Sequence, residues 1–251
     1  MRCAVLSDIH SNLEALTAVL EVLAHESIDQ YLCLGDAIGY GADPLACLER
    51  LQAIQAVMVA GNHEWACLGK MDERWFNEAA RAAVVWTREQ LGFLELDALR
   101  RMPLTASEGP FTLVHGTLRS PSRFDYLVEL GQAVETLSIC RTLFCLVGHT
   151  HVGFAVEYDR SAKRVVQVLA SPQELAEVPF HDEPARLRYL VNPGSVGQPR
   201  DGNPQAGFAV VDTEARRISV RRTAYDVQTA AQKIRAAGLP SFLADRLLVG
   251  R

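Results

Sequence analysis

The chain has 251 residues, of which 49% are hydrophobic and 22% are charged, and its formal net charge is −5. This composition excludes a disordered, collagen-like or coiled-coil protein and is sufficient for one large domain with a sizeable core. The acidic balance predicts no general attraction to nucleic acid or to an anionic membrane, so we expect neither as a partner. An anionic substrate would need a local positive site, such as a bound metal.

The two ends and the thiols bear on the compartment. The chain enters an apparent strand at once, without the charged region and apolar run of a signal peptide, and no segment is long and apolar enough to span a bilayer. The six cysteines stand in apolar surroundings without the paired spacing of a metal knuckle: Cys3, Cys33, Cys47, Cys67, Cys140 and Cys145. Buried, reduced thiols are favoured over a disulfide framework, and we expect a cytoplasmic protein.

In chain order, the first part alternates short apolar strands with helices. Strands are expected at residues 2–7, 31–34 and 57–60. A helix is expected from residue 12 to about 25, because Ser11 and Glu14 are spaced as a capping box and leucines follow at helical spacing. Asp43 and Pro44 indicate the start of a second helix. Strand, helix and strand at this spacing predict a parallel sheet.

The rest of the chain changes in texture. A helical, aromatic-rich stretch at about 64–100 is expected to form either core or a lid. Buried strands are expected at 111–114 and 143–147, on either side of a helix around 126–141. Alternating segments then predict an antiparallel second sheet, at 154–158, 164–169, 187–191, 207–211 and 218–222. Residues 171–183 are expected to form a surface loop and 227–248 a helical tail. The sequence therefore predicts a mixed α/β, two-sheet domain spanning 1–251.

Polar side chains follow five of the predicted strands, where open α/β sheets bind ligands. In chain order these are Asp8 and His10, Asp36, Asn62 and His63, His115, and His149 and His151. Each motif alone is a weak signal, but together they favour a metal site. Imidazoles, carboxylates and an amide suit Mn, Fe, Co, Ni or Zn. Because the donors outnumber the ligands of one ion, we expect two divalent ions roughly 3.5–4 Å apart and in-line attack on phosphorus by a metal-bound hydroxide.

This series resembles the calcineurin-like metallophosphoesterase superfamily and runs in that family's order. The matching motifs are Asp8-x-His10, Gly35-Asp36, Gly61-Asn62-His63-Glu64, His115 and Gly148-His149-x-His151. Longer runs are similar to the small bacterial and archaeal phosphodiesterase branch: Asp8-Ile9-His10-Ser11-Asn12, Gly35-Asp36-Ala37-Ile38-Gly39-Tyr40-Gly41 and Asn192-Pro193-Gly194-Ser195-Val196-Gly197-Gln198-Pro199-Arg200. The resemblance covers most of the chain. It implies a four-layer fold, with helices on both sides of a two-sheet sandwich.

The resemblance also implies roles for individual residues. Asp36 would bridge two metals, with manganese favoured. The other ligands of the first would be Asp8, His10 and His151, and those of the second Asn62, His115 and His149. His63 would not bind metal but would contact the phosphate and protonate the leaving oxygen or stabilise its charge. Ligand histidines must be neutral, so activity should fall at acid pH.

The sequence departs from the phosphoprotein phosphatase branch at three positions. Gly39 and Tyr40 stand where that branch has an aspartate that orients the catalytic histidine and an arginine that clamps phosphate, and Ala60 replaces a further arginine. Protein phosphatase activity is therefore disfavoured. The residue that orients His63 stays open: Glu64 is one candidate, but an acid at the start of a helix is an equal explanation.

Weaker candidates complete the site. Asn12 could contact phosphate or serve only to start a helix, and Arg200 could reach substrate or be a solvated turn residue. His25 and His181 are not expected to be ligands.

We expect a metal-dependent phosphoesterase acting on a small phosphodiester, phosphomonoester or nucleotide pyrophosphate, with aryl phosphodiesters favoured. The alternatives are a non-catalytic scaffold of the same fold, a diadenosine polyphosphate hydrolase, a protein phosphatase and a nuclease, the last disfavoured by the acidic charge. A homo-oligomer is compatible with the sequence.

Overall fold

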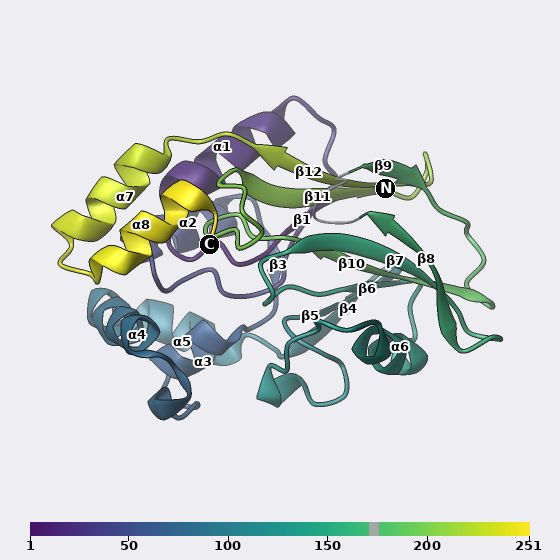
Figure 1. The fold of residues 1–251 in the computed structure, drawn as a ribbon, viewed down its shortest axis with the longest axis horizontal. Coiled ribbons are helices and arrows are strands. Elements are labelled where there is room, and N and C mark those ends of the chain that lie inside the picture. Colours follow the sequence, from purple (N-terminus) through teal and green to yellow (C-terminus); the bar gives the residue numbers. More distant parts are fainter. Residues whose placement is uncertain (171–175) are drawn as a thin grey trace.

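Two mixed six-stranded sheets pack face to face in the computed structural model, which describes residues 1–170 and 176–251 (Figure 1). The first sheet runs from edge to edge through β3 (Val57–Met58), β2 (Gln30–Cys33), β1 (Arg2–Leu6), β11 (Ala206–Asp212), β12 (Arg217–Thr223) and β9 (Glu177–Pro179). The second runs through β4 (Thr105–Glu108), β5 (Phe111–Val114), β6 (Phe144–Leu146), β10 (Leu187–Pro193), β7 (Gly153–Asp159) and β8 (Arg164–Ala170). The expected mixed α/β, two-sheet fold is confirmed.

Helices cover the outer faces of both sheets. Helices α1 (Leu13–Ala24) and α2 (Pro44–Ala53) pack on the first sheet, and α6 (Leu130–Ile139) packs on the second. The remaining helices gather at the left of Figure 1: α3 (Asn62–Cys67), α4 (Glu78–Gln90), α5 (Phe93–Arg101), α7 (Val227–Ala236) and α8 (Ser241–Val249). Two short 3-10 turns, Glu73–Trp75 and Pro121–Arg123, precede α4 and α6. None of the helices in the described ranges is long and apolar enough to cross a membrane.

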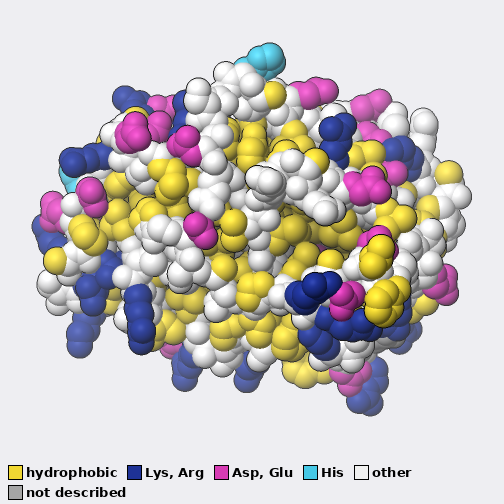
Figure 2. Space-filling model, turned by 180° about the vertical axis from the view of Figure 1, so that it is seen from behind, with side chains coloured by type: hydrophobic (Ala, Val, Ile, Leu, Met, Phe, Trp, Pro, Cys, Tyr) yellow, Lys and Arg dark blue, Asp and Glu magenta, His cyan; other side chains and the backbone are white. Residues whose placement is uncertain are grey.

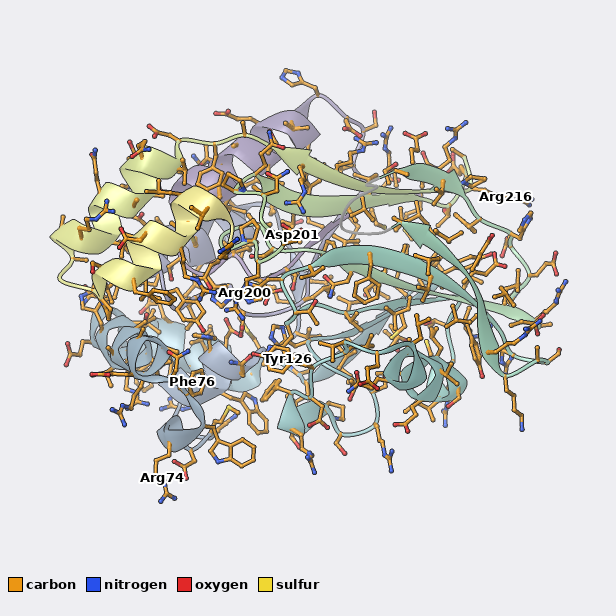
Figure 3. The ribbon with its side chains drawn as sticks, in the orientation of Figure 1. Arg74, Phe76, Tyr126, Arg200, Asp201 and Arg216 are labelled. Carbon is orange, nitrogen blue, oxygen red and sulfur yellow. The ribbon has the colours of Figure 1, made fainter. Side chains whose placement is uncertain are left out.

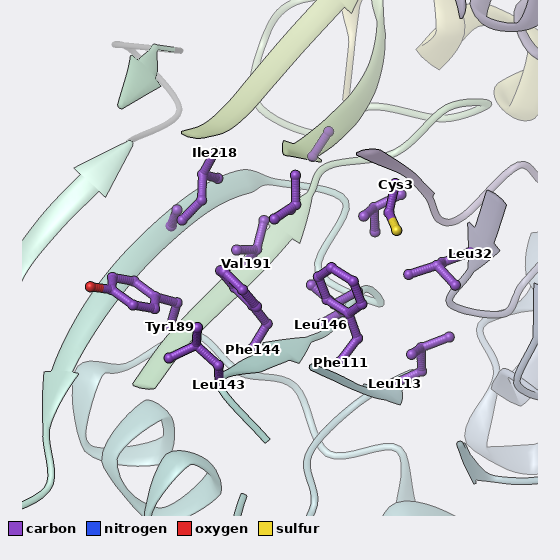
Figure 4. Close-up of a cluster of buried hydrophobic side chains, with 14 of the residues drawn as sticks. Cys3, Leu32, Phe111, Leu113, Leu143, Phe144, Leu146, Tyr189, Val191 and Ile218 are labelled. Atoms are coloured by element: carbon purple, nitrogen blue, oxygen red, sulfur yellow. The ribbon is translucent and has the colours of Figure 1, made fainter. Parts of the chain in front are cut away.

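The main core lies between the sheets (Figure 4). Cys3 and Leu32 of the first sheet contribute to the same buried cluster as Phe111, Leu146 and Val191 of the second. Alternate residues of β1 instead face α1, where Ala4 and Leu6 belong to a second cluster. Because both faces of these strands are buried, they show continuous apolar runs in the sequence. The two clusters fix the position of the loops that follow each strand.

The pairing of the strands differs from the expectation of one parallel and one antiparallel sheet. Each sheet contains both kinds of pair: β1 is parallel to β2 but antiparallel to β11, and β10 is parallel to β6 but antiparallel to β7. Strands β5 and β6 belong to the second sheet. Local apolar patterns predict a strand but not its partner, because pairing depends on contacts between distant parts of the chain.

Two expected helical regions are divided. The stretch at 64–100 holds three helices, because the chain turns at Gly69, whose φ is +67°, and α5 begins only after Gly92. The tail at 227–248 is broken at Gly238 and Pro240. Glycine and proline weaken or end helices, which explains both breaks.

Three further expectations need correction. The N-cap of α1 is Asn12 rather than Ser11, since the Asn12 side chain accepts a hydrogen bond from the Ala15 amide. The helix expected around 126–141 begins only at Leu130. The loop expected at 171–183 contains β9, while its residues 171–175 lie outside the described part of the chain.

Candidate metal centre

The polar residues that follow β1, β2, β3, β5 and β6 come together at one end of the sandwich. All eight are buried: Asp8, His10, Asp36, Asn62, His63, His115, His149 and His151. Buried polar groups of this number require partners, because isolated charges and unpaired donors or acceptors are costly away from water. The structure therefore brings every predicted ligand and His63 into one cluster.

One group of donors comes from the loops after β1 and β6. An oxygen of Asp8, Oδ1, lies 3.3 Å from His151 Nε2 and 3.9 Å from His10 Nε2, and the two imidazole nitrogens are 3.2 Å apart. The spacing of these three residues is that of a set able to hold one ion. The other oxygen of Asp8 accepts hydrogen bonds from the Ser7 hydroxyl and the His149 amide.

A second group lies beside the first. His115 Nε2 is 3.1 Å from both His149 Nδ1 and Asn62 Oδ1. Asp36 faces both groups, because its Oδ2 is 3.3 Å from His115 Nε2 and 3.7 Å from His10 Nε2. Its other oxygen accepts the His63 amide. Asp36 thus has the position that a carboxylate shared by two ions requires.

The hydrogen bonds of the imidazoles test whether these donors fit a cation. Nδ1 of His10, His115 and His151 lies 3.1, 2.7 and 2.6 Å from a backbone carbonyl oxygen, which can only accept. Nδ1 therefore carries the proton, and in the neutral ring Nε2 presents a lone pair to the centre. The Nε2 lone pairs of His10 and His151 then face each other at 3.2 Å, and Asp8 Oδ1 has no hydrogen-bond partner in the described part of the chain. The donors fit divalent cations.

The ionisation of the cluster agrees with cation binding. Burial lowers the pKa of His10, His149 and His151 well below the usual value, so these rings are neutral. Burial also raises the pKa of Asp8 to about 6. Burial alone would lower the pKa of His115, but the attraction of the Asp36 carboxylate and the hydrogen bond that the ring donates to it raise the pKa to about 9. A cation near Asp36 would replace the proton of His115.

The loops carrying these side chains are conformationally strained. Asp8, His10, Asp36, His149 and His151 all have φ between 50° and 66°, in the left-handed region that non-glycine residues rarely adopt. Gly35, at φ +95°, lets the Asp36 loop approach the next one, since a Cβ there would lie 2.6 Å from the Gly61 amide nitrogen. Strain of this kind persists where the surrounding structure holds it, and it gathers at functional sites.

His63 is held by ring packing. Its ring centroid is 4.5 Å from that of Tyr40, 4.7 Å from His10 and 5.3 Å from Phe76. A Cβ on Gly39 would lie 2.2 Å from His63 Nδ1, so only glycine leaves room for the ring. Burial lowers the pKa of His63 to about 4. Gly39 and Tyr40, two of the three positions that depart from the phosphatase pattern, therefore lie beside this histidine.

Glu64 does not contact His63 through a hydrogen bond. Its carboxylate accepts the amides of Asp36, Ala37 and Gly61 at 2.9, 2.8 and 2.7 Å. Glu64 therefore ties the loop after β2 to the start of α3. The interpretation of Glu64 as an acid at a helix start is confirmed. Sequence reasoning missed its hydrogen bonds to the loop after β2.

The segment 192–198 forms hydrogen bonds with the loops that carry Asp8, His149 and His151. Asn192 donates to the Gly148 carbonyl, Ser195 Oγ donates to the Asp8 carbonyl at 2.7 Å, and the Gln198 carbonyl accepts from His151. Sequence reasoning assigned no role to Asn192 or Ser195. Their only signal was the resemblance of the whole motif to a family branch.

The two weaker candidates differ in position. Both ends of the Asn12 amide are engaged, by the Ala15 amide on one side and by the Gly197 carbonyl and Tyr225 hydroxyl on the other, which favours the helix-start role. Arg200 is held by Gln198 at 3.0 Å and lies 5.8 Å from the centroid of the Tyr40 ring. Its Nε atom is buried, and none of the residues that the structure describes forms a hydrogen bond with it. Arg200 stays a candidate substrate contact.

Outside the cluster, His25 and His181 are exposed, as expected of residues that hold no metal. Figure 3 shows Phe76, Tyr126 and Arg200 reaching from different segments toward the same region. Beside Asn62 and His149, a pocket of about 270 Å³ opens between the segment before α4 and the loop 123–126.

Comparison with known proteins identifies the family. The model for the calcineurin-like phosphoesterase superfamily domain matches residues 1–216. The chain belongs to this superfamily. The metallophosphoesterase of Sphaerobacter thermophilus is 35% identical, with a TM-score of 0.84 and complete coverage of both chains. Protein MJ0912 of Methanocaldococcus jannaschii, which is uncharacterized, is 34% identical over 99% of this chain and 98% of its own.

A more distant structure agrees in fold. The hypothetical protein PH1004 of Pyrococcus horikoshii is 22% identical, with a TM-score of 0.76, and the match covers 100% of this chain and 98% of the other. This calcineurin-like chain therefore has the two-sheet fold of metallophosphoesterases and the His and Asp groups with which a metal-dependent family would bind ions.

Proposed function

We propose that this calcineurin-like protein is a binuclear, divalent-metal-dependent phosphoesterase that hydrolyses a small phosphodiester, phosphomonoester or nucleotide pyrophosphate. The observation that supports this best is the position of Asp36 between two donor groups, with lone pairs directed at the space between them. Bound cations would polarise the phosphoryl oxygens and neutralise the charge that builds in the transition state.

The residues of the chain would divide the work. Asp8, His10 and His151 would hold one ion, Asn62, His115 and His149 the other, and Asp36 both. The carbonyl oxygens that accept from Nδ1 of His10, His115 and His151 would fix the ring orientations. His63 would donate a hydrogen bond or its proton to the leaving oxygen.

The donor set bears on the identity of the metal, and the cysteines bear on the cellular compartment. Mixed nitrogen and oxygen ligands favour manganese, with iron, cobalt, nickel and zinc as alternatives, over the oxygen-rich sites of magnesium and calcium. All six cysteines are buried, as expected of small apolar side chains in a core, which supports our proposal of a cytoplasmic protein.

The proposal is tested by replacing Asp36 with asparagine. Because the amide is neutral and a weaker bridge, we expect Asp36→Asn to lose both manganese ions and to hydrolyse bis(4-nitrophenyl) phosphate at the background rate. Metal content by mass spectrometry and turnover are measured on the same samples. Asp182→Asn, at an exposed position, is the matched control and should behave as the parent.

Two results would contradict the proposal. Full turnover in Asp36→Asn would exclude the shared carboxylate. If manganese changed neither the thermal stability nor the turnover of the parent protein, the non-catalytic scaffold would be favoured instead.

A further inference from the structure

The pocket beside the candidate metal centre has an unusual lining. Its volume is about 270 Å³, and five aromatic side chains contribute to its wall: Tyr40, Trp75, Phe76, Phe124 and Tyr126. The charged members, Arg123 and Asp125, pair with each other at 3.3 Å. The wall is therefore aromatic and its charges are mutually neutralised, which suits a planar, uncharged group better than a further phosphate.

Two of these five rings are exposed to solvent. Trp75 is 74% exposed and Tyr126 is 48% exposed. The Tyr126 ring stacks on His149 with centroids 3.9 Å apart, so one of its faces is held beside a predicted ligand. Exposed aromatic surface at a pocket lip offers stacking area that a ligand can bury.

The pocket lies on the His63 side of the centre. Phe76 lines it and also packs edge-on against His63, with ring centroids 5.3 Å apart. Asn62 and His149, two of the predicted metal ligands, line it as well. A phosphoryl group at the metals would thus direct the substituent nearest His63 into the aromatic wall. Since His63 is assigned to the leaving oxygen, that substituent is the leaving group.

We infer that this pocket is a leaving-group site for a planar aromatic ring, either an aryl group or a nucleobase, with Tyr126 as the main stacking surface. The inference rests on the proposed function and adds a substrate class to it: phosphoesters of aromatic alcohols or of nucleosides. Trp75 and Phe76 also line this pocket, and Tyr126 selects for the ring without taking part in the chemistry.

Calorimetry on the manganese-loaded protein tests the inference without turnover. Phenylphosphonate and cyclohexylphosphonate present the same anion to the metals but differ in aromaticity. We expect phenylphosphonate to bind about fivefold more tightly, the size of one good aromatic pair. Tyr126→Ala should abolish this preference, and Tyr126→Phe should keep it. Phe93→Ala removes a ring that is also exposed (75%) on α5, outside the pocket, and should change nothing.

A second comparison separates the two sources of the ring. If adenosine 5′-monophosphate binds more tightly than ribose 5-phosphate, and Tyr126→Ala removes that difference, the pocket accepts a nucleobase; a preference only in the phosphonate pair assigns it to aryl groups. Equal affinities in both pairs, or preferences that survive Tyr126→Ala, would overturn the inference while leaving the proposed function intact. Failure of all four ligands and of inorganic phosphate to bind would overturn both.

Discussion

The surroundings of His63 explain how this protein dispenses with the orienting aspartate of related phosphatases. Gly39 provides the space for the ring, and Tyr40 and Phe76 restrict it by edge contacts. Nδ1 of His63 has no hydrogen-bond partner among the described residues. Packing, rather than a carboxylate, therefore sets the orientation of the ring. A neutral imidazole held this way can donate one hydrogen bond toward the substrate.

Replacing His63 should separate chemistry from metal binding. In His63→Asn we expect both manganese ions to remain and turnover of an alkyl phosphodiester to fall roughly 10²–10⁴-fold, the usual contribution of an acid-base residue. Turnover of a 4-nitrophenyl ester should fall less, because its leaving group needs little protonation. Metal analysis and the two rates provide the measurement. A loss of manganese together with activity would instead make His63 a ligand.

The convergence of the residues at strand ends could be predicted from the sequence. The side chains that hold their loops in place by hydrogen bonds could not. Asp8, Asp36 and His115 follow apolar strands directly, so their convergence follows from sheet geometry. Ser195 and Glu64 act through backbone atoms far away in the sequence, and no local pattern encodes such contacts. Asn12 shows the same limit, because only the structure shows that its amide nitrogen donates to Gly197 and Tyr225, which are distant in the sequence.

At the scale of elements, the loop after β2 is held by several contacts with the start of α3. Gly35 lets it pass close to Gly61, and one carboxylate, that of Glu64, binds three of the neighbouring amides. The loop carries Asp36, so its position determines the distance between the two donor groups. The start of α3 and the end of β2 thus behave as one structural unit.

Glu64→Gln should loosen this unit. The amide nitrogen of glutamine cannot accept, so at least one backbone N–H loses its partner, and we expect a loss of about 1–3 kcal/mol in the free energy of unfolding. Manganese affinity should fall as well, because Asp36 is less well placed. Urea unfolding and metal titration measure the two effects. Glu89→Gln, at an exposed position on α4, is the control. Unchanged values in Glu64→Gln would show that the loop holds Asp36 without this carboxylate.

Elements with strong apolar patterns could be predicted, but their interruptions were harder to see. The leucine stripe of α1 places it within a residue at either end. Strand β4 was missed because Thr105–Glu108 is polar, with two exposed positions, and stands at the edge of its sheet. In the region 64–100, alanine-rich helical sequence predicts one continuous helical stretch, so the turn at Gly69 could not be recognised. Edge strands and turns depend on neighbours more than on composition.

For the whole molecule, the position of the site depends on how the strands are divided between the two sheets. Strands β1 and β2 belong to one sheet and β5 and β6 to the other, so the centre draws its donors from both layers. Only the packing of the two sheets through the core of Figure 4 brings these loops together. That arrangement could not be predicted from spacing alone, although the presence of two sheets could.

The surface charge of the molecule agrees with a small anionic substrate attracted locally. On the face shown in Figure 2, Lys and Arg side chains lie mostly toward the rim, interspersed with Asp and Glu, and apolar side chains occupy much of the middle. With a net charge of −5, the overall field does not attract anions. We therefore expect the buried centre, with Arg200 as a candidate contact, to attract the phosphate.

Because the centre joins both sheets, its occupancy should be visible in the stability of the whole protein. Manganese at about 100 times its dissociation constant would add about 2.7 kcal/mol, or roughly 5–10 °C in melting temperature. Protons compete with the cation. Asp8 must be ionised, and its pKa is raised to about 6; His115 must be neutral, and its pKa is raised to about 9. Both requirements weaken binding as the pH falls.

We therefore expect the manganese-dependent rise in melting temperature to be largest near pH 9 and to shrink steadily toward pH 5.5. Taking the difference with and without manganese at each pH removes the pH dependence of the metal-free fold. Asp36→Asn should show little rise at any pH. A rise that is independent of pH between 5.5 and 9 would mean that the stabilising ions bind away from Asp8 and His115, because only a site without titrating donors escapes this competition.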